Sequence, residues 1–563
     1  MTDQTAPEAK RSTWAALAVF FERRTLIMLA LGFAAGLPNL LVFDTLSAWL
    51  RTAGVSLTII GFFALATLSY SLKFLWAPLI DRTPVPVLTA MFGHRRSWML
   101  VCQAVIILGL WLISGSNPTV NLGLVALFAV FVAFTSATQD IVIDAWRIEA
   151  VGQERQGAMA AAYQWGYRIA ILTAGVAPLF IASRANWGIA YATMAVLMVV
   201  GVIAVLLAPK EKPRPEMAPL MPTDMPVKPL PEAAEWAGRL ALLLIGAVIF
   251  GTGFTGQLAL AKALLGDAAL VGFEQIWAAR PLGVFVQVGF ALVGLTLIAC
   301  TVLPIPGQRT RPGVYFIRSY WEPIKDFLDR FSGTAGLILA MICAYRLSDF
   351  VLNIMTPFYL DVGFSLETVA EIRKVFGVIM LSLGVGVAGW GVARFGLMKC
   401  LVVGAFAGPA SNLVFAWLAL QGPSAQAFAI AIAVDNLTAG FAGTVLIAYM
   451  SSLTSAGFTA TQYALFSSLY ALPGKLIGAQ SGAIVEGSAR AVQNGGLFGG
   501  LRTLFQNAPA DSFARAADIG VSPAALGAGY IIFFFYSCLI GVFALVLAIM
   551  IARRQAKAAP APA

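Results

Sequence analysis

The sequence predicts an all-α integral membrane protein in which two six-helix bundles are joined by two additional transmembrane helices. Composition is the first reason: 59% of the 563 residues are hydrophobic, 11% are charged, and the mean hydropathy is +0.83. A soluble globule exposes far more polar surface than this composition allows. The other reasons are long apolar segments that lack the polar alternation of β-barrel strands, and a weak repeat between the two halves of the chain.

Apolar segments of about 20 residues recur along the chain, and a helix of that length crosses about 30 Å of hydrocarbon. The five cysteines fall in or at the edge of these segments without metal-ligand spacing, so we expect them to be inert. We expect fourteen spans, at 25–49, 57–80, 98–114, 121–144, 157–183, 187–208, 238–258, 281–304, 334–360, 368–393, 398–420, 425–450, 461–488 and 527–552.

Basic residues in the loops predict the orientation of the spans, because cytoplasmic loops are enriched in Lys and Arg. With the N-terminus inside, most Lys and Arg residues lie in cytoplasmic loops; the long loop 489–526 is the exception. Both termini are therefore expected in the cytoplasm. The first 24 residues are polar and basic with no cleavage site, which indicates a tail rather than a signal peptide. The net charge of +10 thus reflects topology and implies no nucleic-acid partner.

The chain shows a parallel repeat on either side of a Pro-rich linker at 209–232. GVSLT at 54–58 recurs as GFSLE at 363–367, an offset of 309 residues, and an offset of 307 aligns Arg168 with Lys475. Two additional spans cross the membrane and return, so both halves enter it in the same orientation. Parallel repeats of six helices are the organisation of the major facilitator superfamily.

This organisation defines the expected domains. They are a cytoplasmic tail (1–24), an N-terminal six-helix bundle (25–208), a cytoplasmic Pro-rich linker (209–237), two extra transmembrane helices (238–304), a cytoplasmic connecting segment (305–333), a C-terminal six-helix bundle (334–552) and a cytoplasmic tail (553–563).

The loop after 57–80 resembles the signature of that superfamily, Gly-x-x-x-Asp-Arg followed by Gly and basic residues. Here it contains Asp81-Arg82 and, after a ten-residue insertion, Gly93-His-Arg95-Arg96, with Ala77 in place of the first glycine. We expect Asp81, Arg82 and Arg95 to take part in closing a cytoplasmic gate.

A polar stripe runs along the fourth span, where Ser136, Asp140, Asp144 and Arg147 share one helical face beside Gln139. Carboxylates inside a membrane cost roughly 2.5–3.5 kcal/mol or more unless they face a partner, the bundle interior or water. The stripe should therefore face neighbouring helices or a cavity.

The two aspartates of this stripe are expected to differ in role. Asp144, at the cytoplasmic end, is expected to form a structural ion pair, either with Arg147 or with the Asp81/Arg82 loop, that holds the inward gate shut; a part in proton coupling is the alternative. Asp140 has no cation within a turn on its own helix, so we expect it to bind cargo or a proton. Gln139 either binds cargo or links helices.

Two cations near the middle of the membrane, Arg168 and Lys475, occupy equivalent places in the two halves. Each either binds cargo or balances a nearby aspartate. Three side chains share the face of Arg168 and make an aromatic and basic surface suited to sugars and carboxylates: Tyr163, Gln164 and Tyr167.

Other polar and small residues in the spans have simpler explanations. Arg346 and Asp349 are three residues apart and should pair, with proton coupling by Asp349 as the alternative. Lys73 lies nearer the cytoplasm; it either takes part in cargo binding or coupling or balances a neighbouring aspartate, and we place it with the gating residues. Gly32 and Gly36 lie one turn apart, and close helix packing explains them more simply than ligand contact.

Enzyme chemistry finds little support. The chain has no Gly-x-x-x-x-Gly-Lys-Ser/Thr phosphate loop, and its single histidine, His94, lies in a basic loop without metal partners. We expect no catalytic residue, no metal and no cofactor.

Several segments resemble one family, the AmpG-like muropeptide permeases, within the group that also includes acetyl-coenzyme A transporters. The segments of this chain that carry the resemblance are GFAAGLP (32–38), KFLWAP (73–78) running into Asp81-Arg82, 93–98, SATQDIVIDAW (136–146), GYR (166–168), YRLSD (345–349) and TATQY (459–463).

The resemblance implies uptake of N-acetylglucosaminyl-1,6-anhydro-N-acetylmuramyl peptides across a bacterial inner membrane, driven by protons, for cell-wall recycling. It also implies functional roles for Gln139, Asp140, Gly32 and Gly36, and, as is usual for this fold, a monomer in the lipid bilayer. The chain departs from the family in placing its extra helices in the middle. Another organic anion, such as a siderophore or coenzyme A ester, stays open as cargo, as does a non-transporting membrane sensor or enzyme.

Overall fold

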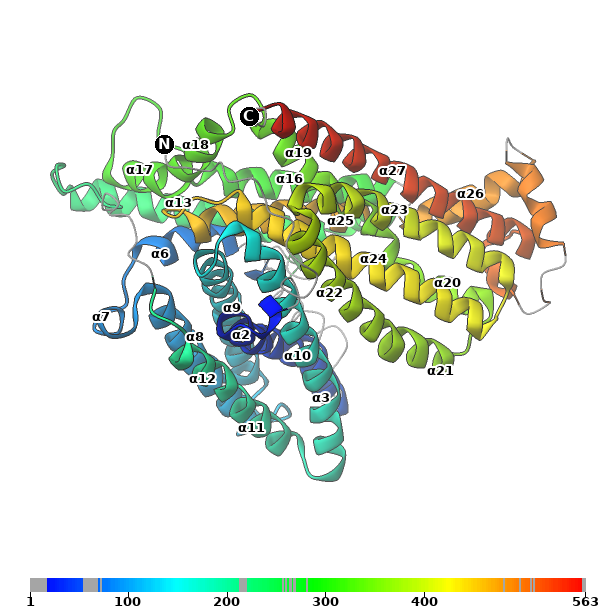
Figure 1. Cartoon of the computed structure of the whole chain (residues 1–563), viewed down its shortest axis with the longest axis horizontal. Coiled ribbons are helices and arrows are strands. Elements are labelled where there is room, and N and C mark those ends of the chain that lie inside the picture. The colour runs from blue at the N-terminus through cyan, green and yellow to red at the C-terminus, as the bar shows by residue number, and fades with distance from the viewer. Residues whose placement is uncertain are drawn as a thin grey trace.

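The computed structural model of the protein describes residues 18–53, 69–70, 73–211, 220–255, 258, 261–262, 266, 270–279, 282–478, 481–495, 498–506, 509 and 512–558. Every regular element in these ranges is a helix. This agrees with the predicted all-α fold (Figure 1).

The N-terminal part of the chain contributes five helices long and apolar enough to cross a membrane. One of them, α11, has a side-chain cap: the Asn186 side chain accepts a hydrogen bond from the Ile189 N–H at 2.8 Å. The elements are η1 (Val19–Phe21), α2 (Arg23–Leu40), η2 (Leu41–Thr45), α3 (Leu46–Thr52), η4 (Lys73–Leu75), α6 (Ala77–Arg82), α7 (Leu88–Phe92), α8 (His94–Ser114), α9 (Leu122–Glu149), η5 (Gln153–Arg155), α10 (Gln156–Arg184), α11 (Trp187–Leu197) and α12 (Val199–Leu207).

Between the halves lie two apolar helices and a connecting segment of short helices. Thr310 caps the connecting segment, since its hydroxyl accepts from the Gly313 N–H at 3.1 Å. The elements are α13 (Pro229–Thr255), α15 (Val271–Ala278), α16 (Leu282–Cys300), α17 (Arg311–Phe316), η7 (Ile317–Trp321) and α18 (Glu322–Arg330).

The C-terminal part contributes five further helices of membrane-spanning length. The elements are α19 (Ala335–Ala344), η8 (Leu347–Asn353), α20 (Met355–Val362), α21 (Leu366–Val369), η9 (Ala370–Phe376), α22 (Gly377–Phe395), α23 (Leu397–Gln421), α24 (Ala425–Ser452), α25 (Thr459–Gly478), α26 (Ser481–Gln493), η10 (Gly499–Phe505), η11 (Ala514–Ile519) and α27 (Pro523–Ala558).

Eleven candidate membrane spans are present in the described residues, and each overlaps one of the fourteen expected from the sequence. Of the other three, 57–80 lies mostly outside the described residues, and 281–304 contains the shorter apolar helix Phe285–Cys300. The third, 461–488, covers α25 and α26 on either side of two residues that are not described. The count of fourteen stays a prediction.

The expected span 334–360 is not one continuous helix. α19 ends at Ala344, a 3-10 segment runs from Leu347 to Asn353, and α20 begins at Met355. Irregular backbone at membrane depth is tolerated where it is buried in protein or lines a cavity. The interruption therefore marks a place where the helix faces the interior rather than lipid.

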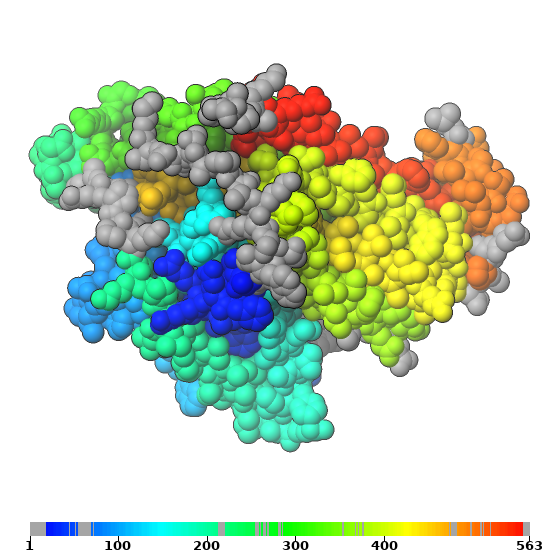
Figure 2. Space-filling model, in the orientation of Figure 1, coloured from blue at the N-terminus to red at the C-terminus, as the bar shows by residue number. Residues whose placement is uncertain are grey.

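The helices form two groups that meet near α25 and where α10 packs against α22. Figure 1 shows the blue and cyan helices as one group and the yellow to red helices as another, running in different directions from the region of α18 and α25. Figure 2 shows the same division on the molecular surface. Separate apolar cores fill the groups: one packs around Leu37 and Tyr191, another around Phe358 and Phe534.

The two apolar helices between the halves, α13 and α16, pack directly on each other and attach to the N-terminal group. Small residues allow the contact, since a Cβ on Gly294 would clash with the Phe250 backbone. Phe250 and its buried neighbours contact Phe74, Leu75 and Trp76 of the segment before α6. The extra pair thus lies outside the two main cores and against the N-terminal group.

Candidate functional site

The polar stripe of α9 is buried, as the sequence predicts. The Gln139 amide donates to the carbonyl oxygen of Ala34 on α2 at 2.9 Å, while its own side-chain oxygen has no partner. The Asp140 side chain is buried, and its Oδ1 has no hydrogen-bond partner among the described residues. Gln139 therefore links two helices and Asp140 keeps an unused acceptor.

Asp144 forms the ion pair expected with Arg147, at 3.3 Å, and a second one with Lys73 at 3.7 Å. Lys73 is also close enough to Asp140 to attract its carboxylate. The sequence missed this contact because Lys73 lies far from both aspartates along the chain. One lysine therefore interacts with two buried carboxylates, so the charge of one carboxylate changes how strongly the lysine interacts with the other.

Arg147 extends from α9 to the opposite group of helices. Its guanidinium donates to the Ser451 hydroxyl of α24 at 2.8 Å and lies 5.1 Å from the ring centre of Tyr463 on α25. The side chain is fully buried. A buried charge held by groups from both halves ties the halves together at this end of the molecule.

Asp81 forms three hydrogen bonds between the halves. Its carboxylate accepts hydrogen bonds from the N–H groups of Ala460 and Thr461, at 3.2 and 2.7 Å, and from the Thr461 hydroxyl at 2.6 Å. These residues form the first turn of α25, where free N–H groups and the helix dipole favour an anion. Arg95 donates to the same carboxylate at 2.6 Å.

The connecting segment also touches both halves at this end. Arg82 of α6 pairs with Glu322 of α18 at 3.0 Å. Arg330, at the other end of α18, donates to the side-chain oxygen of Gln462 on α25 at 3.1 Å, and Gln462 donates to Asp326 at 2.8 Å. We call this end, where α6, α9, α18 and α25 meet, the closed end; the loop charges predict that it is cytoplasmic.

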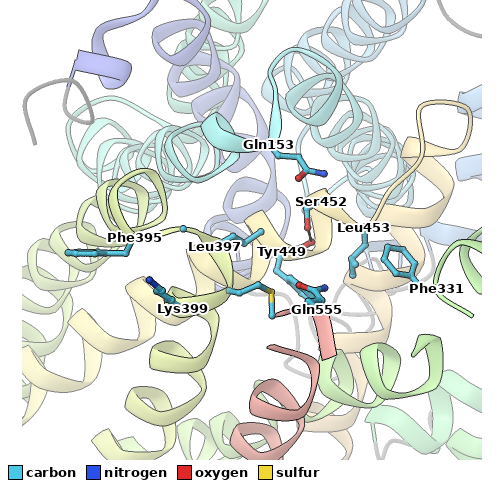
Figure 3. Close-up of a pocket in the computed structure, with 11 residues that line it drawn as sticks. Gln153, Phe331, Phe395, Leu397, Lys399, Tyr449, Ser452, Leu453 and Gln555 are labelled. Carbon is cyan, nitrogen blue, oxygen red and sulfur yellow. Dashed lines mark hydrogen bonds between the residues drawn. The ribbon is translucent and has the colours of Figure 1, made fainter. Parts of the chain in front are cut away.

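A cavity of about 410 Å³ opens at the closed end (Figure 3). Gln153, from the loop between α9 and α10, faces it from one half, and Lys399, Tyr449 and Gln555 face it from the other. None of the residues predicted to bind cargo lines this cavity, so it is separate from the stripe on α9.

The aromatic face of α10 forms as expected. The rings of Tyr163 and Tyr167 lie 5.9 Å apart, and the Tyr167 hydroxyl accepts from the Asn39 amide at 2.5 Å. Gln164 is half-buried beside them. The side chain of Lys475 lies outside the described residues. That Lys475 and Arg168 occupy equivalent places in the two halves therefore stays a prediction.

Arg346 and Asp349 pair with each other, as their spacing predicts: Arg346 Nε donates to Asp349 Oδ2 at 2.5 Å. Both residues lie at the interruption between α19 and α20. Although they are in the middle of a span, their side chains keep 32% and 33% of their surface accessible. The sequence predicted the pair and missed the interruption that exposes it.

Gly32 and Gly36 lie where α2 contacts α10, in agreement with the packing explanation. A Cβ on Gly32 would clash with the carbonyl oxygen of Tyr163, and one on Gly36 would lie 2.8 Å from that of Tyr167. Gly166 makes the reciprocal contact with Leu29 on α2. The glycines thus set the distance between the two helices that carry Asn39 and the tyrosines.

We therefore expect Gly32→Ala to destabilise the protein by about 1–3 kcal/mol, because overpacking forces the backbones apart. The measurement is the unfolding temperature of the purified protein. Gly123→Ala is the matched control, since no heavy atom lies within 4 Å of its added Cβ. An unchanged unfolding temperature with lost cargo binding would instead assign Gly32 to ligand contact.

Comparison with known protein families matches two family models to the chain. Acetyl-coenzyme A transporter 1 matches residues 24–122, and the Major Facilitator Superfamily matches residues 85–478. The chain belongs to the major facilitator superfamily. As a member of that superfamily it is a multi-pass membrane transporter of a small molecule, not an enzyme.

Relatives within the superfamily confirm the resemblance seen in the sequence. The anhydromuropeptide permease of Escherichia coli K12 is 28% identical over 473 residues, 84% of this chain and 76% of that protein. A Rickettsia conorii protein that carries the name AmpG 4 is 27% identical over 471 residues, 83% of this chain and 91% of that protein. The solved structure of the proton:xylose symporter XylE aligns with 94% of this chain and 95% of its own at 11% identity, with a TM-score of 0.47.

Proposed function

We propose that this transporter imports anhydro-muropeptides from the periplasm to the cytoplasm together with protons, for cell-wall recycling. The similarity to anhydromuropeptide permease over 84% of the chain supports the cargo. The bacterial inner membrane is then its location, with both termini in the cytoplasm and the chain acting as a monomer in the bilayer. The two six-helix bundles, 25–208 and 334–552, are the bodies that move.

The observation that carries the proposal is the buried pair of carboxylates on α9, Asp140 and Asp144, which share Lys73. A carboxylate removed from water favours its protonated form, which is what a reversible proton carrier requires. Because Asp140 keeps a free acceptor atom, a proton bound there adds no steric conflict. Import of an anion against the membrane potential needs more than one proton, and Asp140 is the first candidate to carry one.

The closed end supports alternating access. Asp81 and Arg147 hold the halves together on the predicted cytoplasmic side, and α10 packs against α22, where Trp165 donates to the Ser382 carbonyl at 2.7 Å (Figure 1). We assign this arrangement to a state closed toward the cytoplasm. Entry into the opposite state then requires these contacts to break, and protonation of the neighbouring α9 carboxylates is the proposed trigger.

A coenzyme A ester is the second candidate cargo. Residues 24–122 match the model of acetyl-coenzyme A transporter 1, and this range includes Gly32, Lys73 and Arg95. The larger extent of the similarity to the E. coli permease favours the muropeptide.

Uptake into proteoliposomes tests the proposal. With an inward proton gradient, we expect labelled N-acetylglucosaminyl-1,6-anhydro-N-acetylmuramyl tripeptide to accumulate above its outside concentration, and a protonophore to abolish the accumulation. Acetyl-coenzyme A serves as the competing cargo in a parallel assay. Binding of the muropeptide without accumulation would favour a sensor, and accumulation of the coenzyme A ester alone would favour the second cargo.

A further inference from the structure

The guanidinium of Arg168 has no acidic partner in the part of the chain that the structure describes. Its Nε is buried without a hydrogen-bond partner, and no carboxylate of the described residues lies within 4.0 Å of the group. An uncompensated charge at this depth is costly, so a cation in a span usually pairs or faces a ligand path. By contrast, Arg147 and Arg95, two buried arginines at the closed end, each have an acidic partner.

The guanidinium of Arg346, which belongs to the other half, is close enough to Arg168 for the two positive charges to repel each other, and the Tyr470 hydroxyl of α25 is close enough to interact with both. Arg346 lies at the interruption between α19 and α20, where about a third of its side chain is accessible. Transporters commonly bind substrates at such interrupted helices.

The two arginines differ in their acidic neighbours. Arg346 pairs with Asp349, and Asp435 of α24 is close enough to attract it, whereas no carboxylate of the described residues pairs with Arg168. Guanidinium groups match the geometry of carboxylates and bind them through two parallel N–H donors. A single carboxylate between Arg168 and Arg346 would pair with Arg168 and offset the repulsion between the two guanidinium groups.

We propose that Arg168 and Arg346 together bind one carboxylate of the cargo, with Tyr470 as an additional donor; this rests on the proposed transport of an acidic cargo and adds the group that is recognised. The site joins a residue of α10 to one at the start of η8, so its occupation draws the halves together. When it is empty, like charges oppose that approach, which disfavours closure without cargo.

The test compares uptake of the muropeptide with uptake of its methyl ester, in which the carboxylates are masked. Wild-type protein should prefer the acid. Arg168→Gln and Arg346→Gln should each raise KM for the acid roughly tenfold to a hundredfold, the range for loss of a charge-assisted hydrogen bond, and leave KM for the ester unchanged. Arg346→Lys keeps the positive charge but loses the two parallel N–H donors of the guanidinium, so it should retain part of the preference for the acid over the ester.

Arg184→Gln is the matched control, because it removes the same charge from the exposed end of α10, where Arg184 stacks on Phe180. It should behave as wild type toward both compounds. Equal losses for acid and ester in the Arg168 and Arg346 variants would overturn the proposal, as would an unchanged preference for the acid.

A binding measurement separates this proposal from the transport function. Citrate should raise the unfolding temperature of the wild type and of Arg184→Gln, and leave Arg168→Gln and Arg346→Gln unchanged. Asp349→Asn, which removes the internal counter-charge, should give a larger increase than the wild type. If no muropeptide is transported but this pattern appears, the proposed cargo is wrong and the anion site stands; stabilisation of every variant alike, or of none, refutes the site.

Discussion

Replacing Asp140 by Asn is expected to abolish muropeptide uptake driven by a pH gradient while the protein still folds. Asn has almost the same shape and cannot exchange a proton in the physiological range. No described residue forms a hydrogen bond with the Asp140 Oδ1, so among these residues the substitution breaks no hydrogen bond at that atom. Uptake into proteoliposomes with an inward proton gradient should fall to the background, and the unfolding temperature should stay within a few degrees.

Exchange without a gradient gives the second half of this test. If Asp140 couples the proton rather than builds the fold, Asp140→Asn should still exchange labelled for unlabelled muropeptide across the membrane. Asp329→Asn is the control, because Asp329 is an exposed acid in the connecting segment. Full gradient-driven accumulation by Asp140→Asn would remove Asp140 from the coupling mechanism.

The fold was predictable because its signals are local. Each apolar segment has a length that the bilayer imposes, so the apolar segments of the sequence located the eleven candidate spans, most of them to within about five residues, although Pro229–Gly253 begins nine residues before the expected span 238–258. The same holds for contacts one turn apart, such as Arg346 with Asp349 and Arg147 with Asp144. Spacing on a helix determines those pairs before any tertiary structure exists.

The contacts that close the molecule were not predictable in the same way. Asp81 contacts the first turn of α25 across 379 and 380 residues of chain, and nothing near Asp81 in the sequence identifies that partner. The sequence placed Asp81 in a gate and could not name Thr461. Lys73 and its pair with Asp144 show the same limit, because helices far apart in the chain supply the two charges.

The interruption of the span at 334–360 had no visible signal either. The residues between Ala344 and Met355 include no glycine or proline that would break a helix. Tertiary contacts decide the conformation there, since Tyr345 donates to the Leu401 carbonyl at 3.1 Å and Asn412 reaches the Ser348 carbonyl at 3.5 Å. Predicting it requires the packed C-terminal half.

Asp81→Ala is expected to have two effects. It should shift the protein toward the state in which the halves separate at the cytoplasmic end, and it should lower the stability of the protein. The substitution leaves the first turn of α25 without its acceptor and takes one of two carboxylates from the buried Arg95. Breaking a buried pair costs about 3–5 kcal/mol, and the loss should fall near the lower limit because Glu149 still contacts Arg95 at 2.8 Å. The unfolding temperature of the purified variant measures the loss.

Glu149→Gln separates the loss of stability in Asp81→Ala from the opening of the cytoplasmic end. Glu149 also pairs with Arg95, so its loss should lower stability, but it lies on α9 and leaves the contact between Asp81 and α25 in place.

A cysteine at Ala464, a buried residue of α25 packed against the N-terminal half, reports opening in a background without the five native cysteines. A membrane-impermeant maleimide should label it faster from the cytoplasmic side in Asp81→Ala than in Glu149→Gln. Equal labelling rates in the two variants would mean that Asp81 supports the fold through Arg95 alone and that the gate is held by Arg147 and α18 instead.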